Sequence, residues 1–214
     1  THMRLLKRIL SYPSRLRRSR GFGVHSPFAY NFITKVLREK EAQYYAYAEI
    51  AAFCPRARKA SFNEIFAGQD ISIPEAHQLF RILVHFNSQH IMEVGHGHEV
   101  TNIILGRAVP HAKVYFWDHA RTPQIPPGDD IEPLMLINQI PNQAFDDLAE
   151  DIFNHMQRRN CVIVVRNLYH IKSSRRMWER LLEFKDFGMA FSDGYMGVFV
   201  ARRSLPSQYY EITT

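Results

Sequence analysis

The sequence has few cysteines and no long apolar run, and each shortage removes a class of protein. Cys54 and Cys161 lie far apart and form no C-x-x-C pair, so we expect a reduced cytoplasmic protein without a disulfide framework. No segment approaches the ~20 apolar residues that a membrane-spanning helix needs. The basic N-terminus is not followed by the apolar stretch of a secretory signal, and internal repeats are also lacking.

Acidic residues are missing from positions 1–20, a segment that we call the basic arm. It carries seven basic residues, whereas the rest of the chain has 20 basic and 21 acidic residues, so the net charge of +6 comes from the arm. Leu5, Leu6, Ile9 and Leu10 predict a short amphipathic helix there. Three roles stay open for the arm: contact with anionic lipid, contact with nucleic acid, or packing on its own domain.

Hydrophobic patterning predicts a helical extension over residues 1–65 and an α/β domain over residues 66–214. Ser26-Pro27 indicates a helix start, since serine accepts a hydrogen bond from the first turn and proline has no N–H to leave unpaired. A further helix is expected from Tyr44 to Phe53, ending before Pro55. In the domain we expect helices at 74–86, 100–108, 143–158 and 173–184, and strands at 90–94, 113–118, 134–140, 161–165, 189–191 and 198–202.

Strands that alternate with helices predict an α/β, Rossmann-like fold with a mostly parallel sheet. The continuous apolar run from Cys161 to Val165 is typical of a strand buried on both faces. The last two strands could pair antiparallel. The segment between Asp118 and Leu134 is too short for a helix, a strand and a second helix, so we expect the sheet to be shortened by one strand.

A glycine-containing turn follows the first predicted strand, in the sequence EVGHGHE at residues 93–99. Glycines at Gly95 and Gly97 let the backbone approach a nucleotide-like ligand, because no Cβ intrudes. Asp118 ends the next strand, where a carboxylate can accept hydrogen bonds from both ribose hydroxyls. The alternative is that the two glycines only make a tight turn and that Asp118 is a solvated strand end.

Several blocks resemble one known family. The sequence RGFGVHSPF at residues 20–28 contains a G-x-G-x-H-S-P-F motif, and LYH at 168–170 is followed by MWE at 177–179, GVF at 197–199 and YY at 209–210. These blocks resemble a divergent group of bacterial class I S-adenosylmethionine-dependent methyltransferase-like proteins, and the resemblance spans roughly residues 20–212. It implies a class I methyltransferase fold and S-adenosylmethionine as the cofactor.

By this resemblance, Glu93 and the turn of Gly95 and Gly97 face the methionine and ribose part of the cofactor, and Asp118 holds the ribose. The chain departs from the family pattern at Glu99, which stands where a third small residue is usual. A carboxylate pointing inward there would crowd the ligand and repel its carboxylate, so we expect S-adenosylmethionine to bind weakly.

Metal ligands are also replaced. Related metal-dependent O-methyltransferases place acidic residues after the fourth and fifth strands, whereas this chain has Asn138 and then Arg166-Asn167. Arginine cannot ligate a cation and repels it, so we expect no Mg²⁺ or Ca²⁺. The histidines His96, His98 and His119 could in principle bind zinc, but a chain with eleven histidines produces an H-x-H pattern by chance.

His170 follows the central strand at the edge of the sheet where ligands bind in α/β folds, so it is a candidate general base; a structural or solvated histidine is the alternative. Two functions stay open. One is a metal-independent methyltransferase that works by positioning an in-line nucleophile, with an unknown substrate. The other is a relic of the methyltransferase fold that acts as a binding or scaffold protein.

Overall fold

A computed structural model describes residues 24–39, 42, 44–60, 71–95, 99–117, 132–141 and 144–213. The basic arm lies outside these residues, so its helix and its contacts stay predictions. The elements, in chain order, are α3 (Pro27–Phe32), the π-helical η1 (Ile33–Leu37), α4 (Ala46–Ala60), α5 (Ile73–Phe86), β1 (His90–Val94), α6 (Glu99–Ala108), β2 (Lys113–Trp117), β3 (Leu134–Ile137), α7 (Phe145–Arg158), β4 (Cys161–Val165), α8 (Lys172–Glu183), β5 (Met189–Ser192), β6 (Gly197–Ala201) and β7 (Gln208–Glu211).

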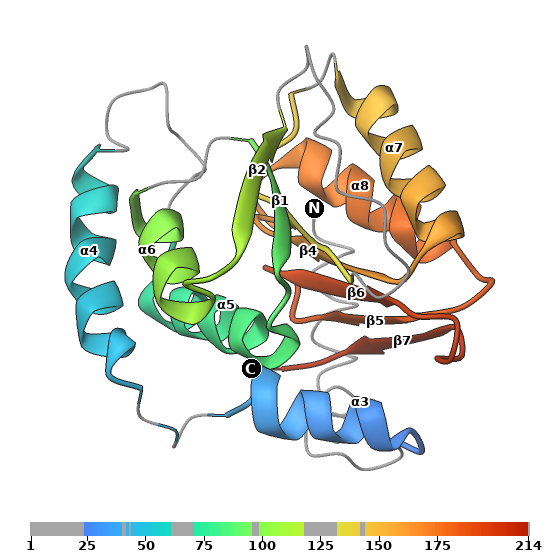
Figure 1. The fold of residues 1–214 in the computed structure, drawn as a ribbon, viewed down its shortest axis with the longest axis horizontal. Coiled ribbons are helices and arrows are strands. Elements are labelled where there is room, and N and C mark those ends of the chain that lie inside the picture. Colours follow the sequence, from blue (N-terminus) through green and yellow to red (C-terminus); the bar gives the residue numbers. More distant parts are fainter. Residues whose placement is uncertain are drawn as a thin grey trace, which may run out of the picture.

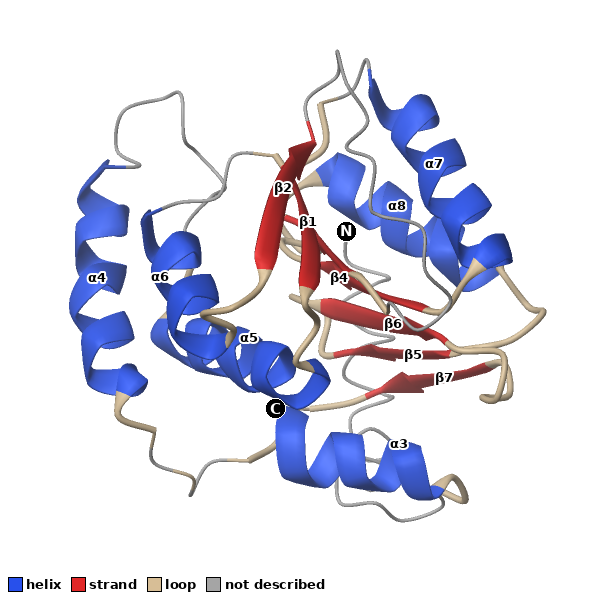
Figure 2. Ribbon diagram, in the orientation of Figure 1, coloured by secondary structure: helices blue, strands red, loops and turns tan. Residues whose placement is uncertain are grey.

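Seven strands form one sheet in the order β2-β1-β3-β4-β6-β5-β7 (Figure 2). β1 pairs parallel with β2 and β3, and β3 pairs parallel with β4. β6 runs antiparallel to β4 and β5, and β7 is parallel to β5. The predicted α/β, Rossmann-like fold with a mostly parallel sheet is therefore confirmed, together with the antiparallel pair near the C-terminus.

Helices cover both faces of the sheet, with α4, α5 and α6 on one side and α7 and α8 on the other (Figure 1). Side chains alternate between these layers along β4: Val162 and Val164 pack toward α5 and α6, and Cys161, Ile163 and Val165 pack toward α7 and α8. All five are fully buried. The central position predicted for this strand is confirmed.

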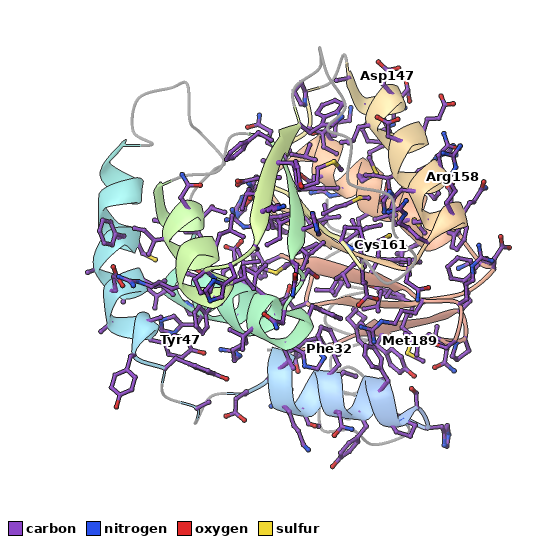
Figure 3. All side chains as sticks on the ribbon, in the orientation of Figure 1. Phe32, Tyr47, Asp147, Arg158, Cys161 and Met189 are labelled. Carbon is purple, nitrogen blue, oxygen red and sulfur yellow. The ribbon has the colours of Figure 1, made fainter. Side chains whose placement is uncertain are left out.

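α3 belongs to the same core as the sheet. The Oγ of Ser26 accepts a hydrogen bond from the N–H of Ala29 at 3.3 Å, and Pro27 opens the first turn, as the sequence predicts. Phe32 is fully buried, and its ring centroid lies 4.9 Å from that of Phe191 on β5. Figure 3 shows Phe32 on the side of α3 that faces the strands. Residues before position 65 thus contribute to the sheet's core.

Two predicted boundaries are wrong. α4 does not stop before Pro55 but continues to Ala60. A proline removes only one backbone hydrogen bond, and the buried Ile50 and Cys54 hold the helix in the core shared with α5 and α6. β3 ends at Ile137 rather than at residue 140. The next residue, Asn138, still donates its backbone N–H to β1, and its side chain joins a buried polar network described below.

The edge strands of the sheet are β2 and β7. In the described part of the chain, β2 has a neighbour on one side only. The predicted loss of a strand concerns residues 118–131, which lie outside the described residues. At the opposite edge β7 adds a strand that the sequence analysis did not predict, and Tyr210 of β7 stacks on Phe191 at a centroid distance of 5.3 Å. Within the described residues, none of the helices combines the length and apolar character that crossing a membrane requires.

Candidate functional site

The carboxyl ends of β1 and β3 lie side by side at the point where the direction of the strand order reverses. After β1 the chain crosses through α6 to β2, and after β3 it crosses through α7 to β4 on the other side. Ligands of open α/β sheets bind at such a switch point. Glu93 is the penultimate residue of β1, and Asn138 directly follows β3, with its backbone N–H 2.9 Å from the carbonyl oxygen of Val94.

A buried polar network joins the ends of three strands to α5. The Nδ2 of Asn138 donates to Oε1 of Glu93 at 2.6 Å, and Nη1 of Arg166, directly after β4, donates to Oδ1 of Asn138 at 2.9 Å. The Nε of Arg166 donates to Oε1 of Glu75, in the first turn of α5, at 3.1 Å. The predicted places of Asn138 and Arg166 at the carboxyl ends of their strands are confirmed by these contacts.

Two atoms of this network are buried without a hydrogen-bond partner among the described residues. They are Oε2 of Glu93 and Nη2 of Arg166. The side chains are 0% and 1% exposed, respectively. Burial raises the pKa of Glu93, and the amide of Asn138 and the charge of Arg166 oppose that rise. The described residues thus leave one acceptor oxygen and one donor nitrogen of this network without a hydrogen bond.

Gly95 follows β1 with φ of +77°, in the left-handed region that favours glycine. A Cβ at this position would lie 2.3 Å from the backbone oxygen of Gln139. The loop after β3 therefore already explains why a glycine is needed here, and the role of Gly95 in cofactor binding stays a prediction. Gly97 and Asp118 lie outside the described residues. For Glu99 the structure describes only the backbone, at the first position of α6.

His170 lies in the turn that follows β4 and is exposed, four residues beyond the buried Arg166. Its backbone N–H donates to the carbonyl oxygen of Asn167 at 3.1 Å, and its ring lies edge-on to that of Tyr169 at 5.2 Å. Asn167 has φ of +60°, a conformation that asparagine tolerates better than most residues. The Nδ2 of Asn167 donates to the carbonyl oxygen of Asn138 at 3.2 Å, so His170 is linked to the buried network through its backbone, by way of Asn167. This link does not involve the imidazole, and the catalytic role of His170 stays a prediction.

Glu75 is the member of the network that sequence reasoning missed. It lies 91 positions before Arg166, in the first turn of α5, the helix that precedes β1. The contact with Arg166 shows that the N-terminus of α5 lies at the carboxyl edge of the sheet. In the sequence, Glu75 is recognisable only as an acidic residue three positions after the N-cap residue Ser72. The Oγ of Ser72 accepts a hydrogen bond from the N–H of Glu75 at 3.3 Å. That pattern is ordinary for a helix start, so it could not have indicated a site.

A cavity of about 600 Å³ opens beside Glu75, between η1, the start of α4, α5 and the turn that joins β5 to β6. The ring of Tyr47, labelled at the start of α4 in Figure 3, stacks on His77 with centroids 3.7 Å apart and planes 6° apart. Sequence analysis predicted none of this lining, which comes from segments distant along the chain: Glu39, Tyr47, Glu75, Gln78, Asp193 and Tyr195.

Arg81 holds the wall of the cavity together. Its Nε and Nη2 donate to the carbonyl oxygens of Val36 and Leu37 at 2.7 and 3.3 Å, and its Nη1 donates to the hydroxyl of Tyr47 at 3.1 Å. Burial raises the pKa of Tyr47 and lowers that of His77. Both rings are therefore uncharged at neutral pH.

In the described residues, no group of three or more His, Cys, Asp or Glu side chains is arranged to hold a metal ion. The histidine set His96, His98 and His119 lies outside those residues, so it is not placed. At the ends of β3 and β4 the side chains of Asn138 and Arg166 are bound to each other, with the guanidinium 2.9 Å from the amide oxygen.

No protein-family model matches this chain, and no curated protein matches it. Among solved structures, it is similar to the O-methyltransferase TomG from Streptomyces achromogenes, which is involved in tomaymycin synthesis and was solved in complex with SAM. The two share 15% sequence identity at a TM-score of 0.44, over 79% of this chain and 93% of the other. At this identity and score the likeness does not assign a function to the chain.

Proposed function

We propose that the protein is an S-adenosylmethionine-dependent methyltransferase that works without a metal ion, on a substrate still to be identified. One observation carries the proposal: Glu93 is completely buried at the switch point of the sheet, yet one of its carboxylate oxygens has no partner in the described chain. An unpaired buried oxygen costs free energy unless a ligand completes it. The family resemblance of the sequence blocks supports the same reading.

The residues at the switch point fit an amino-acid-bearing ligand. An ammonium or hydroxyl group needs an acceptor such as Oε2 of Glu93, and a carboxylate needs a donor such as Nη2 of Arg166. In this proposal Gly95 and Gly97 line the turn beside the ligand, and Asp118 accepts from its ribose. S-adenosylmethionine supplies a methyl group activated by a positive sulfur, so the chain has mainly to position the nucleophile.

The proposal includes no divalent cation, because the positive charge of Arg166 lies where a metal ion would bind. Its guanidinium stands at the end of β4 and occupies the amide oxygen of Asn138 that a metal ion would need. His170, exposed beside the end of β4, is the proposed base that takes the proton of the methyl acceptor. Activity that is abolished by a chelator and restored by Mg²⁺ would contradict this part.

The alternative is a relic that binds no S-adenosylmethionine and serves as a binding or scaffold protein. Two observations favour it. The other oxygen of Glu93 is already held by Asn138, and the space above Gly95 is filled by the backbone of Gln139. Either contact could have replaced a ligand during the loss of activity.

Calorimetric titration with S-adenosylmethionine, together with thermal unfolding, tests the proposal. Ligand at 100 times its dissociation constant adds ~2.7 kcal/mol of stability, which a melting shift detects. Glu93→Gln keeps an oxygen for Asn138 but replaces the open acceptor with a donor, so we expect binding to be lost. Glu150→Gln, exposed on α7, is the matched control and should bind as the unmodified chain does.

Glu99→Gly completes the experiment. If the Glu99 carboxylate crowds the ligand, the glycine variant binds more tightly than the unmodified chain. Absence of binding in both the unmodified chain and Glu99→Gly would overturn the proposal in favour of the relic. Binding that survives in Glu93→Gln would remove Glu93 from the site.

A further inference from the structure

Gln78, on α5, carries a nearly buried amide that has no hydrogen-bond partner. The residue is 6% exposed, and neither its side-chain nitrogen nor its side-chain oxygen is hydrogen-bonded to any described residue. Buried amides are nearly always hydrogen-bonded, because an unpaired buried donor or acceptor costs free energy. The open amide of Gln78 therefore indicates a partner that the described chain does not supply.

Two spaces border Gln78, and only one of them can hold such a partner. The first is a small gap toward the sheet, whose lining includes Leu37, Phe191 and Val198, and it has no room for a water molecule. The second is the cavity of about 600 Å³ beside Glu75, which Gln78 also lines. The partner of the amide must therefore come from the cavity, whose volume is typical of pockets that bind small organic molecules.

The charged side chains of the cavity lining already have partners within the protein. Arg81 donates three hydrogen bonds to the wall, and Glu75 is paired with Arg166. Oδ1 of Asp193 accepts from two backbone N–H groups of its own turn, and Oε1 of Glu39 accepts from a backbone N–H three residues on. We therefore expect a ligand to be recognised by the neutral amide of Gln78 rather than by an unpaired charge.

The chemistry of a carboxamide defines the partner that it needs. Its N–H donor lies beside its oxygen acceptor, so both are completed by a partner that presents an acceptor beside a donor. Glutamine and asparagine pair in this way with flat heterocycles, as in their bidentate contacts to N6 and N7 of adenine. Aromatic side chains also line the cavity, among them Tyr47, which stacks on His77. Aromatic surface of this kind favours contact with a flat ring.

We propose that this cavity binds a neutral, flat heterocycle of the lactam type, whose ring N–H lies beside a carbonyl group. The ring N–H donates to Oε1 of Gln78, and the ring carbonyl accepts from Nε2. Binding does not need S-adenosylmethionine, and only a role of this ligand as methyl acceptor rests on the proposed function. Because the binding test omits the cofactor, failure of this proposal and failure of the proposed function are distinguishable.

Two neutral probes of the same shape test the hydrogen-bonding pattern. 2-Quinolinone is a bicyclic lactam, and coumarin differs from it by a ring oxygen in place of the N–H. Both keep the carbonyl, but coumarin sets an oxygen against Oε1 of Gln78, where the lactam sets a donor. Ligand-detected NMR titration of the full chain measures both dissociation constants. 2-Quinolinone should bind at least tenfold more tightly than coumarin.

Gln78→Met locates the contact. Methionine has nearly the length of glutamine and no amide, so 2-quinolinone should weaken to the level of coumarin, while coumarin changes less than the lactam does. Because the replaced amide has no partner in the chain, we expect the variant to fold, which circular dichroism checks. The matched control is Gln157→Met, exposed on α7, which should leave the binding of both probes unchanged.

Three results would overturn the proposal. They are the absence of 2-quinolinone binding, coumarin binding as tightly as 2-quinolinone, and 2-quinolinone binding that folded Gln78→Met retains in full. The first two are measured on the unmodified chain, so they decide even if Gln78→Met does not fold.

Discussion

Glu93 is an acidic residue whose burial disfavours its charged form. It is fully buried, its pKa is raised by that burial, and one of its oxygens lacks a partner among the described residues. The amide of Asn138 and the guanidinium of Arg166 reduce this cost without removing it. A buried acidic residue with a perturbed pKa at a strand end is a feature that functional sites often share.

Glu93→Gln should therefore stabilise the protein, and more so as the pH rises. A carboxyl whose folded pKa is raised contributes stability below its unfolded pKa and loses it as the pH rises through the folded pKa. Glutamine has no such titration. Urea unfolding of both proteins between pH 4 and pH 8 should show the variant gaining relative to the unmodified chain as the pH rises. A difference that is constant with pH would show that Glu93 does not titrate differently on folding.

Gly95 is a position where the local backbone of the protein, rather than a ligand, already requires glycine. Gly95→Ala has to adopt φ near +77° and place its Cβ against the backbone of Gln139. We expect a loss of about 2–5 kcal/mol, the sum of left-handed strain and overpacking. The control is Gly106→Ala in α6, where a Cβ meets nothing within 4 Å and the helix should gain about 0.5–1 kcal/mol. Urea denaturation that gives both variants the same sign of change would contradict this account.

At the scale of elements, the sequence predicted those whose pattern is local. A run of five apolar residues predicts β4, and a serine–proline pair predicts the start of α3. β7 was missed because its short, mostly exposed sequence, Gln208–Glu211, has no strong alternation and depends on pairing with β5. Glu75 was missed for the same physical reason, since its contact with Arg166 exists only after the sheet and α5 have packed.

The packing of α8 on the antiparallel part of the sheet depends on one small residue. A Cβ on Gly197, at the start of β6, would lie 2.6 Å from the indole of Trp178, which is buried in α8. Gly197→Ala should cost about 1–3 kcal/mol. Trp178→Leu removes the indole that the new Cβ would meet. The stability loss of the double variant should therefore be smaller than the sum of the two single-variant losses, by about 0.5–3 kcal/mol. Additive losses in urea unfolding would show that Trp178 moves aside freely.

At the scale of the whole molecule, the excess positive charge and the hydrophobic core come from different parts of the chain. The first 20 residues carry seven basic residues and no acidic ones, and the remainder has 20 basic and 21 acidic residues. The core, in contrast, already includes Ala29, Phe32 and Ile33, each 0% exposed. Function at the arm is therefore expected to depend on charge, while stability depends on the residues from α3 onward.

Two truncations test this separation. Removing residues 1–20 should leave a chain that unfolds cooperatively at nearly the same temperature. Removing residues 1–45 also deletes α3 and η1, and with them apolar side chains that each contribute about 1.5–3 kcal/mol when buried. Losing Phe32 and Ile33 alone approaches the 5–15 kcal/mol that holds a typical domain folded, and it exposes Phe191 on β5 as well. Both truncations remove the arm's seven basic residues, so circular dichroism melting curves compare packing between them. Unfolding of the first truncated chain would show that the arm belongs to the core, and an intact second one would show that α3 does not.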